Sequence, residues 1–308
     1  MKRGLPLGVD VGVARTCVAL AERGPDGRAR LVAAASSPTG EDPVAAIRAA
    51  RAELGTRERR CVLALRAPDS LVRAIVLPPA GRRERERAAA FEAARFAPHA
   101  LDDGVVRLLA LEGGEHAVAV ARRSALDRAL TIVRSAGLRA VAVDDAAFAV
   151  LRVHAADAIV DIGASASTVI VRGAALPFVR SVSLGGERLT DAIVAALGVD
   201  RASAEQRKRS LGMAGAGEPV RDALVDHVAG ALVEARAGGA HDPRAVVLTG
   251  NGARVAGLAP AIERALAVPT RLATFGADTC TTLPLDVVRA AAPDWGLAYG
   301  LALWECAA

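Results

Sequence analysis

Two short segments of this chain have the residue types and the spacing that binding of a polyphosphate requires. The segments V-D-V-G at 9–12 and V-D-I-G at 160–163 each place an aspartate two residues before a glycine. A glycine in a tight hairpin turn lets backbone N–H groups converge on an anion, because no Cβ stands between them. An aspartate beside the turn can hold Mg²⁺ directly or through water. We therefore predict that Asp10 and Asp161 bind a metal next to phosphate groups.

A third segment has the composition of a nucleoside site. Gly250-Asn251-Gly252 follows an apolar run at 245–248, and small residues at such a turn let a flat base or a ribose lie against the backbone. One Asp-x-Gly hairpin alone is typical of an ordinary β-turn. Two of them with matched flanks indicate an internal duplication, and together with the third turn they predict a two-lobed nucleotide clamp.

Other common catalytic motifs are absent from the sequence. The chain has no Gly-Lys pair, so a P-loop is excluded, and it has neither a G-x-S-x-G nor an H-E-x-x-H segment. The glycines at 8–12 open a hairpin and not a helix, which excludes a dinucleotide-binding fingerprint. Enzyme classes built on these motifs are therefore not expected.

Composition sets further limits on function. The 308 residues carry 39 Lys plus Arg against 34 Asp plus Glu, a formal charge of +5, and aromatic residues make up only 3%. This length suggests two domains, and the aromatic content excludes stacking platforms for nucleic acid. Lys2 and Lys208 are the only lysines among the basic residues, which draws attention to Lys208.

Cysteine usage and hydropathy predict a cytosolic protein. Cys17, Cys61, Cys280 and Cys306 form no C-x-x-C pair and are expected to be reduced thiols. The basic start of the chain lacks the apolar core of a signal peptide, and no run of 18 residues is free of charge. We expect any membrane association to depend on a partner.

Strands alternate with helices along the chain, which predicts an α/β fold. Strands are predicted at 5–12, 16–20, 30–35, 61–65, 72–77, 105–111, 116–121, 158–171 (two strands joined by a turn), 178–184, 245–248 and 270–272. Helices are predicted at 42–54, 82–96, 124–136, 187–197, 202–211, 219–237, 257–266 and 297–305. The segment 140–149 is treated as a connection between the lobes.

These motifs, in this order, resemble the actin/Hsp70/sugar-kinase superfamily and, within it, the PilM-like proteins of type IV pilus assembly. The resemblance extends over essentially the whole chain. Its segments are a phosphate-1 loop at 8–12, a phosphate-2 loop at 161–168, the following segment at 180–193, a helix motif at 204–208, an adenosine motif at 248–258, and an insertion marked by L-P-P at 77–79 and E-A-A-R-F-A-P at 92–98.

The resemblance implies an actin-like (ASKHA) two-lobed α/β fold with duplicated ribonuclease H-like domains. It implies a first lobe at 1–155, with a small α/β subdomain inserted at about 78–140. The second lobe is then expected at 156–289, and a C-terminal helix at 290–308 is expected to return to the first lobe.

The same resemblance implies a cytoplasmic scaffold that binds ATP and Mg²⁺ between its lobes. Its expected partner is the N-terminal tail of a PilN-like inner-membrane protein, docked near residues 60–110. Pilus motor ATPases and self-association are further expected contacts. Asp10 and Asp161 are the expected catalytic and metal-binding residues. The expected nucleotide-binding residues are Gly12, Val13, Ala14, Arg15, Gly163, Ala164, Ser165, Ser167, Thr168, Gly185, Gly186, Glu205, Lys208, Gly250, Asn251, Gly252 and Ala253.

The first turn departs from the family pattern, which usually offers serines and a lysine. Val13, Ala14, Arg15 and Cys17 stand there, so hydroxyl donors are missing and at most slow ATP hydrolysis is expected. Two alternatives stay open. One is a small-molecule kinase of the superfamily, for which the candidate bases are the aspartates at 144–145. The other is an actin-like protein of cell division or type II secretion, although the chain shows neither an amphipathic tail nor a membrane span.

Overall fold

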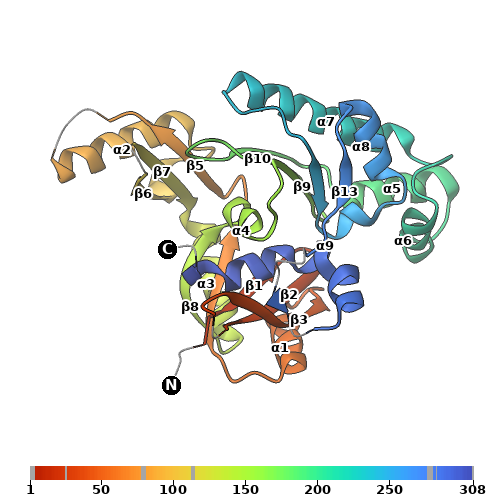
Figure 1. Ribbon diagram of the computed structural model, residues 1–308, viewed down its shortest axis with the longest axis horizontal. Coiled ribbons are helices and arrows are strands. Elements are labelled where there is room, and N and C mark those ends of the chain that lie inside the picture. Colours follow the sequence, from red (N-terminus) through yellow and green to blue (C-terminus); the bar gives the residue numbers. More distant parts are fainter. Residues whose placement is uncertain are drawn as a thin grey trace.

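The computed structural model describes residues 4–24, 26–77, 81–111, 115–275, 280–281 and 283–306 (Figure 1). The Pro-Pro pair at 78–79, the side chain of Cys280 and the chain end at 307–308 lie outside the described residues. Strands and helices alternate as predicted. The segment 140–149, treated above as a connection, forms β8 and the start of α4.

The strands are β1 (Leu7–Val11), β2 (Arg15–Arg23), β3 (Ala29–Pro38), β4 (Arg60–Leu65), β5 (Ser70–Ile75), β6 (Gly104–Ala110), β7 (His116–Arg122), β8 (Arg139–Asp145), β9 (Ala158–Ile162), β10 (Ser167–Val171), β11 (Phe178–Val182), β12 (Val246–Thr249), β13 (Thr270–Leu272) and β14 (Cys280–Thr281). The helices are α1 (Pro43–Leu54), α2 (Arg82–Phe96), α3 (Arg123–Ser135), α4 (Ala146–Val153), α5 (Gly186–Leu197), α6 (Arg201–Ser210), α7 (Glu218–Ala237), α8 (Leu258–Leu266) and α9 (Leu285–Ala302). Short 3₁₀ turns are Leu101–Asp103, Asn251–Arg254 and Trp304–Cys306.

Two sheets share one topology, which explains the repeated sequence motif. The first has the order β3-β2-β1-β4-β8, extended at its edge by β14, and the second has the order β11-β10-β9-β12-β13. In each sheet the first three strands are antiparallel and the last two join in parallel. Because β1 and β9 hold the central position, both Asp-x-Gly turns start from the middle of a sheet.

A third sheet, β5-β7-β6, carries α2 on one face and forms a small subdomain. Ala89 and Ala93 of α2 pack against Val118 and Val120 of β7. β5 joins this sheet through antiparallel pairing with β7, whereas Val133 of α3 packs into the core of the first lobe. The third sheet and α2 span 70–122, which begins before and ends before the expected insertion at about 78–140.

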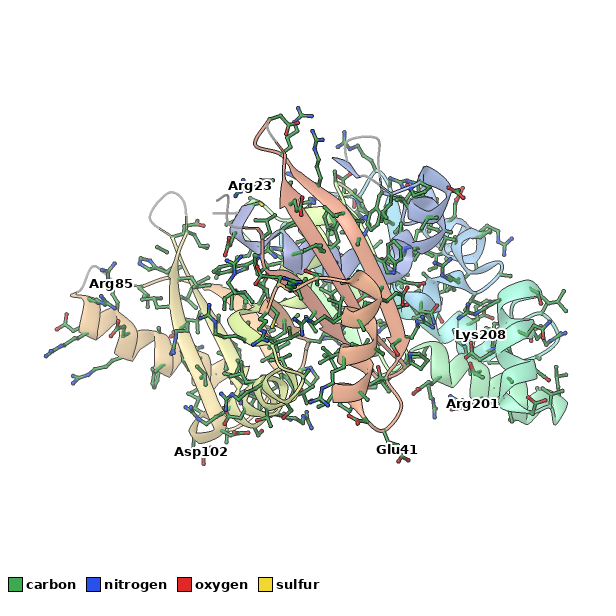
Figure 2. All side chains as sticks on the ribbon, turned by 90° about the horizontal axis from the view of Figure 1, so that it is seen from below. Arg23, Glu41, Arg85, Asp102, Arg201 and Lys208 are labelled. Carbon is green, nitrogen blue, oxygen red and sulfur yellow. The ribbon has the colours of Figure 1, made fainter. Side chains whose placement is uncertain are left out.

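The subdomain and α6 lie at opposite ends of the molecule. Figure 2 shows Arg85 of α2 at one end and Lys208 of α6 at the other. Within the parts of the chain that the structure describes, no helix is both long and apolar enough to cross a membrane.

Helix α9 crosses the joint between the lobes, with Pro293 inside it. It begins and ends earlier in the chain than the helix predicted at 297–305 and than the expected span of 290–308. It packs against β1 of the first lobe and against α4 (Figure 1). A Cβ on Gly8 would overlap the Ala298 carbonyl oxygen, and one on Gly300 would overlap the Ala149 carbonyl oxygen. These contacts bring backbone against backbone, so the crossing requires glycine at both positions.

His154 ends α4 and is buried in the same joint, with 4% of its surface exposed. Its ring lies parallel to that of Phe275, with centroids 6.4 Å apart. Its Nε2 atom has no hydrogen-bond partner among the described residues. Burial, helped by the positive charges of Arg271 and Arg172, lowers the pKa of His154 to about 4. The imidazole is therefore neutral at physiological pH.

This histidine is expected to make the fold sensitive to acid. Between pH 6.5 and 4 the unfolded chain takes up a proton that the folded chain excludes, so the free energy of unfolding falls by ~3 kcal/mol over this range. His154→Phe is expected to remove this contribution to the pH dependence of the free energy of unfolding, which urea titrations at pH 7, 6, 5 and 4 measure. Equal slopes for the two proteins would contradict this account.

Candidate functional site

The two Asp-x-Gly segments form hairpin turns with the same hydrogen bond. In the turn between β1 and β2, the Gly12 amide donates to the Arg15 carbonyl over 3.0 Å. In the turn between β9 and β10, the Gly163 amide donates to the Ala166 carbonyl over 2.9 Å. An ideal Cβ on Gly12 would lie 2.7 Å from the Arg15 carbonyl oxygen, so a side chain would open the turn.

The tips of both turns offer free backbone donors. The amides of Val13, Ala14, Ala164 and Ser165 donate to no acceptor within the described ranges of the chain. N–H groups that converge from two turns form a binding site for an anion such as a phosphate group.

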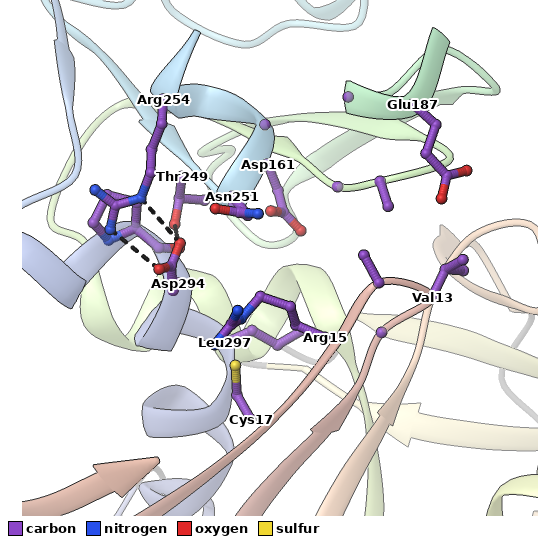
Figure 3. Close-up of a pocket in the computed structure, with 18 of the residues that line it drawn as sticks. Val13, Arg15, Cys17, Asp161, Glu187, Thr249, Asn251, Arg254, Asp294 and Leu297 are labelled. Carbon is purple, nitrogen blue, oxygen red and sulfur yellow. Dashed lines mark hydrogen bonds and ion pairs between the residues drawn. The ribbon is translucent and has the colours of Figure 1, made fainter. Parts of the chain in front are cut away.

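The turn between β1 and β2 lacks serines, but hydrogen bonds from Thr39 hold its backbone in place. The Thr39 amide donates to the Ala14 carbonyl over 3.0 Å, and its hydroxyl donates to the Gly12 carbonyl over 2.8 Å. Arg15 donates to the Ser36 hydroxyl, and its side chain runs along the cavity (Figure 3). The turn therefore keeps its shape, although its side chains offer no hydroxyl to a ligand.

Asp10 and Asp161 lie near the ends of their strands and line one cavity. Arg66, which directly follows β4, donates to Asp10 Oδ1 over 2.7 Å. Burial raises the pKa of Asp161; the positive charge of Arg66 opposes this rise and the negative charge of Asp10 adds to it. The two carboxylates therefore share one cationic neighbour.

Lys208 of α6 is buried and uses its ammonium group inside the protein. Its Nζ donates to the Gly186 carbonyl over 2.9 Å, to the Thr190 hydroxyl over 2.7 Å and to Glu205 Oε1 over 2.6 Å. Burial lowers the pKa of Lys208, and Glu205 partly offsets this effect. Burial opposes ionisation of Glu205 as well, but hydrogen bonds from Lys208 and Thr190 lower its pKa. Lys208 thus fixes α6 against the start of α5.

The third turn, at Gly250–Gly252, packs closely against the hairpin between β9 and β10. Gly250 has φ +80°, and a Cβ on Gly252 would lie 2.5 Å from Cγ2 of Ile162. The Asn251 side chain accepts a hydrogen bond from Arg209 of α6 over 3.2 Å. The turn is therefore held against both the second sheet and α6.

Four predicted segments meet at Gly186. An ideal Cβ on Gly186 would be 3.6 Å from the Gly163 carbonyl oxygen, from Gly252 Cα and from Lys208 Nζ. The amides of Gly186 and Glu187 also donate to the carbonyls of Gly163 and Ala164. The predicted phosphate, helix and adenosine motifs thus surround one point.

These segments enclose a cavity of about 320 Å³ between the lobes. In Figure 3, Arg15 and Cys17 approach from the first lobe, and Asp161 and Asn251 from the second. The predicted residues that line it are Asp10, Gly12, Val13, Ala14, Arg15, Asp161, Gly163, Ala164, Gly186, Glu205, Lys208, Gly250, Asn251 and Gly252.

Five predicted residues do not line this cavity. Ser165 and Thr168 line a second hollow of about 400 Å³ beside it. Ser167 is buried and donates to the Leu184 carbonyl over 2.6 Å. Gly185 precedes α5, where a Cβ would lie 2.5 Å from the Ala164 carbonyl oxygen, and Ala253 is buried in the core of the second lobe.

The cavity also contains charged groups that were not predicted from the sequence: Arg66 and the ion pair between Arg254 and Asp294. This pair, with atoms 3.2 Å apart, closes one end of the cavity (Figure 3). No local spacing links Asp294 on α9 to the third turn. A signal for Arg66 was present: it follows the strand predicted at 61–65, and the ends of parallel neighbouring strands meet at one sheet edge.

A family model described as type IV pilus assembly protein PilM matches residues 39–306. The chain belongs to this family. A search of curated proteins finds no significant sequence match.

Comparison with solved structures shows which fold the chain has. A chain of the solved "PilM-PilN type IV pilus biogenesis complex" is similar at 26% identity and TM-score 0.85, over 98% of both chains. The ethanolamine utilization protein EutJ from Carboxydothermus hydrogenoformans is similar at 15% identity and TM-score 0.55, over 99% of this chain and 91% of that one. The activator of 2-hydroxyisocaproyl-CoA dehydratase from Clostridium difficile, solved with bound ADPNP, is similar at 14% identity and TM-score 0.50, over 97% and 93%. The predicted actin-like α/β fold is confirmed.

The residues of this PilM-family cavity fit a nucleoside polyphosphate. Its volume lies within the usual range of ligand pockets. Unpaired backbone amides of the two hairpin turns face the cavity from both lobes. At the third turn, Gly252 lets the backbone itself line the cavity.

The same residues fit a protein-held Mg²⁺ poorly. Asp10 Oδ1 already accepts a hydrogen bond from Arg66, so a Mg²⁺ ion there would compete with the guanidinium. Mg²⁺ usually keeps several waters and is bound through one or two carboxylates plus phosphates. The pair Asp10 and Asp161 offers two carboxylates, and one of them is already paired with Arg66.

Proposed function

We propose that this PilM-family protein binds ATP between its lobes and docks the N-terminal cytoplasmic tail of a PilN-like inner-membrane protein. The proposal of ATP binding rests on the two matching hairpin turns, β1–β2 and β9–β10. Both have the same internal hydrogen bond and free amides at their tips, and they face one cavity from opposite lobes.

In this proposal the turn amides hold the phosphate oxygens. The third turn and α6 hold the nucleoside, with Glu205 and Lys208 fixing the wall of that end. Relatives of the same fold support this assignment, since one of them was solved with ADPNP.

Any hydrolysis of ATP would rest on Asp161 more than on Asp10. A general base works best when its pKa lies near the working pH. Burial raises the pKa of Asp161, whereas Asp10 accepts a hydrogen bond from Arg66. We propose at most slow turnover, because the first turn supplies no hydroxyl or lysine. The nucleotide would then control the conformation of the protein or its assembly with a partner.

The partner proposal rests on the family and on the likeness to a protein that was solved in complex with PilN. We propose that the tail docks in the first lobe near residues 60–110. The second hollow lies beside this range and is lined by the end of β4 and by α3. The protein would then be cytoplasmic and held at the inner membrane through this partner. Contacts with pilus motor ATPases and self-association stay expectations.

No observation favours the kinase alternative. Asp144 is paired with Arg152, and Asp145 accepts hydrogen bonds from the Ser70 hydroxyl over 2.7 Å and the Ala147 amide over 2.9 Å. Neither aspartate lines the main cavity.

The nucleotide part is tested by titrating ATP and ADP in Mg²⁺ buffer into the wild type, Val13→Glu and Val76→Glu. Both valines are exposed, 62% and 95%, but only Val13 lines the cavity. Val13→Glu places a carboxylate beside the phosphate groups and is expected to weaken binding at least about tenfold, while Val76→Glu binds like the wild type. Absence of binding, or equal affinity of the two variants, would contradict the proposal.

The partner part is tested with a fluorescent peptide copy of the tail, by anisotropy, with and without ATP. We expect saturable binding whose affinity changes when ATP is present. A peptide that fails to bind while ATP binds would remove the docking function and leave the nucleotide function standing.

A further inference from the structure

We propose that Arg66 is a built-in counter-ion for Asp10 and Asp161, so that the cavity binds a nucleoside polyphosphate without a divalent cation. This inference rests on the proposed nucleotide binding and specifies its ionic requirement.

The first support is the position of Arg66. Its guanidinium donates to Asp10 Oδ1 over 2.7 Å, and it lines the same cavity as Asp10 and Asp161. The Asp10 side chain is 12% exposed and that of Arg66 38% exposed, so Asp10 is largely covered while the Arg66 side chain stays accessible at the cavity wall. The positive charge of Arg66 also acts on Asp161 across the interlobe cavity.

The second support is how firmly the backbone of Arg66 is held. Arg66 stands at the end of β4, and its carbonyl accepts hydrogen bonds from the Asp69 amide over 2.8 Å and the Ser70 amide over 3.1 Å. These bonds form the turn that leads into the small subdomain. The side chain therefore starts from a fixed point next to β1, the parallel neighbour of β4 that carries Asp10.

The third support is the chemistry of the guanidinium group. It is always charged and has five N–H donors in a planar fork. The bond to Asp10 uses one donor, which leaves others for phosphate oxygens, the ligands that arginine binds best. A metal ion bound to Asp10 Oδ1 would have to displace this group. Arg66 thus does two things that Mg²⁺ does elsewhere: it neutralises carboxylates and attracts phosphate.

The test is calorimetry with ATP and ADP in EDTA and in MgCl₂, for the wild type, Arg66→Gln and Arg66→Lys. For the wild type we expect affinities in the two buffers within about threefold. Arg66→Gln loses charged hydrogen bonds and is expected to bind at least about tenfold more weakly in EDTA, with recovery in MgCl₂. Arg66→Lys keeps the charge and is expected to lie between them. Arg122→Gln is the matched control, because it breaks a first-lobe ion pair with Asp69, 3.1 Å long, outside the main cavity.

A second readout needs no nucleotide. Removal of Arg66 leaves two carboxylates without their counter-ion, so MgCl₂ alone is expected to raise the melting temperature of Arg66→Gln and not that of the wild type or Arg122→Gln. If Arg66 had a purely structural role, Arg66→Gln would melt at a lower temperature than the wild type, and by the same amount with and without MgCl₂.

The possible failures are distinguishable. Wild-type binding in MgCl₂ that is lost in EDTA overturns this inference and leaves the proposed function standing, whatever the variants do. Absence of binding in both buffers overturns the proposed function and the inference with it.

Discussion

Replacement of Gly300 by valine is expected to lower the free energy of unfolding by about 3 kcal/mol or more. A Cβ at this position would overlap the Ala149 carbonyl oxygen, where α9 crosses α4. The neighbouring atoms are backbone and cannot rotate away, so the two helices would have to separate. Buried residues on both sides of the crossing, such as Val150 and Leu301, would lose contact. Urea unfolding followed by circular dichroism measures the loss.

The matched control is Gly230→Val. Gly230 also lies within a helix, α7, but nothing lies within 4 Å of its ideal Cβ. This variant is expected to change stability by less than about 1 kcal/mol, because valine has a somewhat better helix propensity than glycine. Equal losses at the two glycines would show that the crossing is not tight.

Replacement of Lys208 by methionine is expected to weaken ATP binding at least about tenfold. The change removes hydrogen bonds to Gly186, Thr190 and Glu205 and leaves Glu205 without its cation. Because Glu205 is 38% exposed, water can solvate it, so we expect a loss of stability of only about 2 kcal/mol. The larger effect falls on the ligand, since α6 is no longer fixed against the start of α5.

Calorimetry and thermal melting of the same preparations separate these two effects. Gln206→Met is the control. It also introduces methionine into α6, but at an exposed position two residues before Lys208. The interpretation fails if Lys208→Met binds ATP as the wild type does, or if Gln206→Met loses affinity equally.

The sequence determined those features that depend on short stretches of chain. Each Asp-x-Gly turn is closed by a hydrogen bond between residues three apart, so its apolar flanks and its glycine suffice to predict it. The duplication was visible for the same reason, because each copy repeats the same local pattern. Strand alternation also explains one imprecision of the site: Ser167 and Thr168 are adjacent on β10 and point to opposite faces. Ser167 faces inward and Thr168 lines the second hollow.

Only the tertiary structure decided how these turns are completed. Arg66 reaches Asp10 because β4 lies parallel to β1, and Asp294 reaches Arg254 because α9 returns to the cavity from the end of the chain. The start of the small subdomain at β5 depends likewise on pairing with β7, far along the sequence. Such contacts join residues about 40 or more positions apart, and no local propensity encodes them. The turns were therefore predictable from composition and spacing, whereas the charges that surround them depend on how the two lobes fold together.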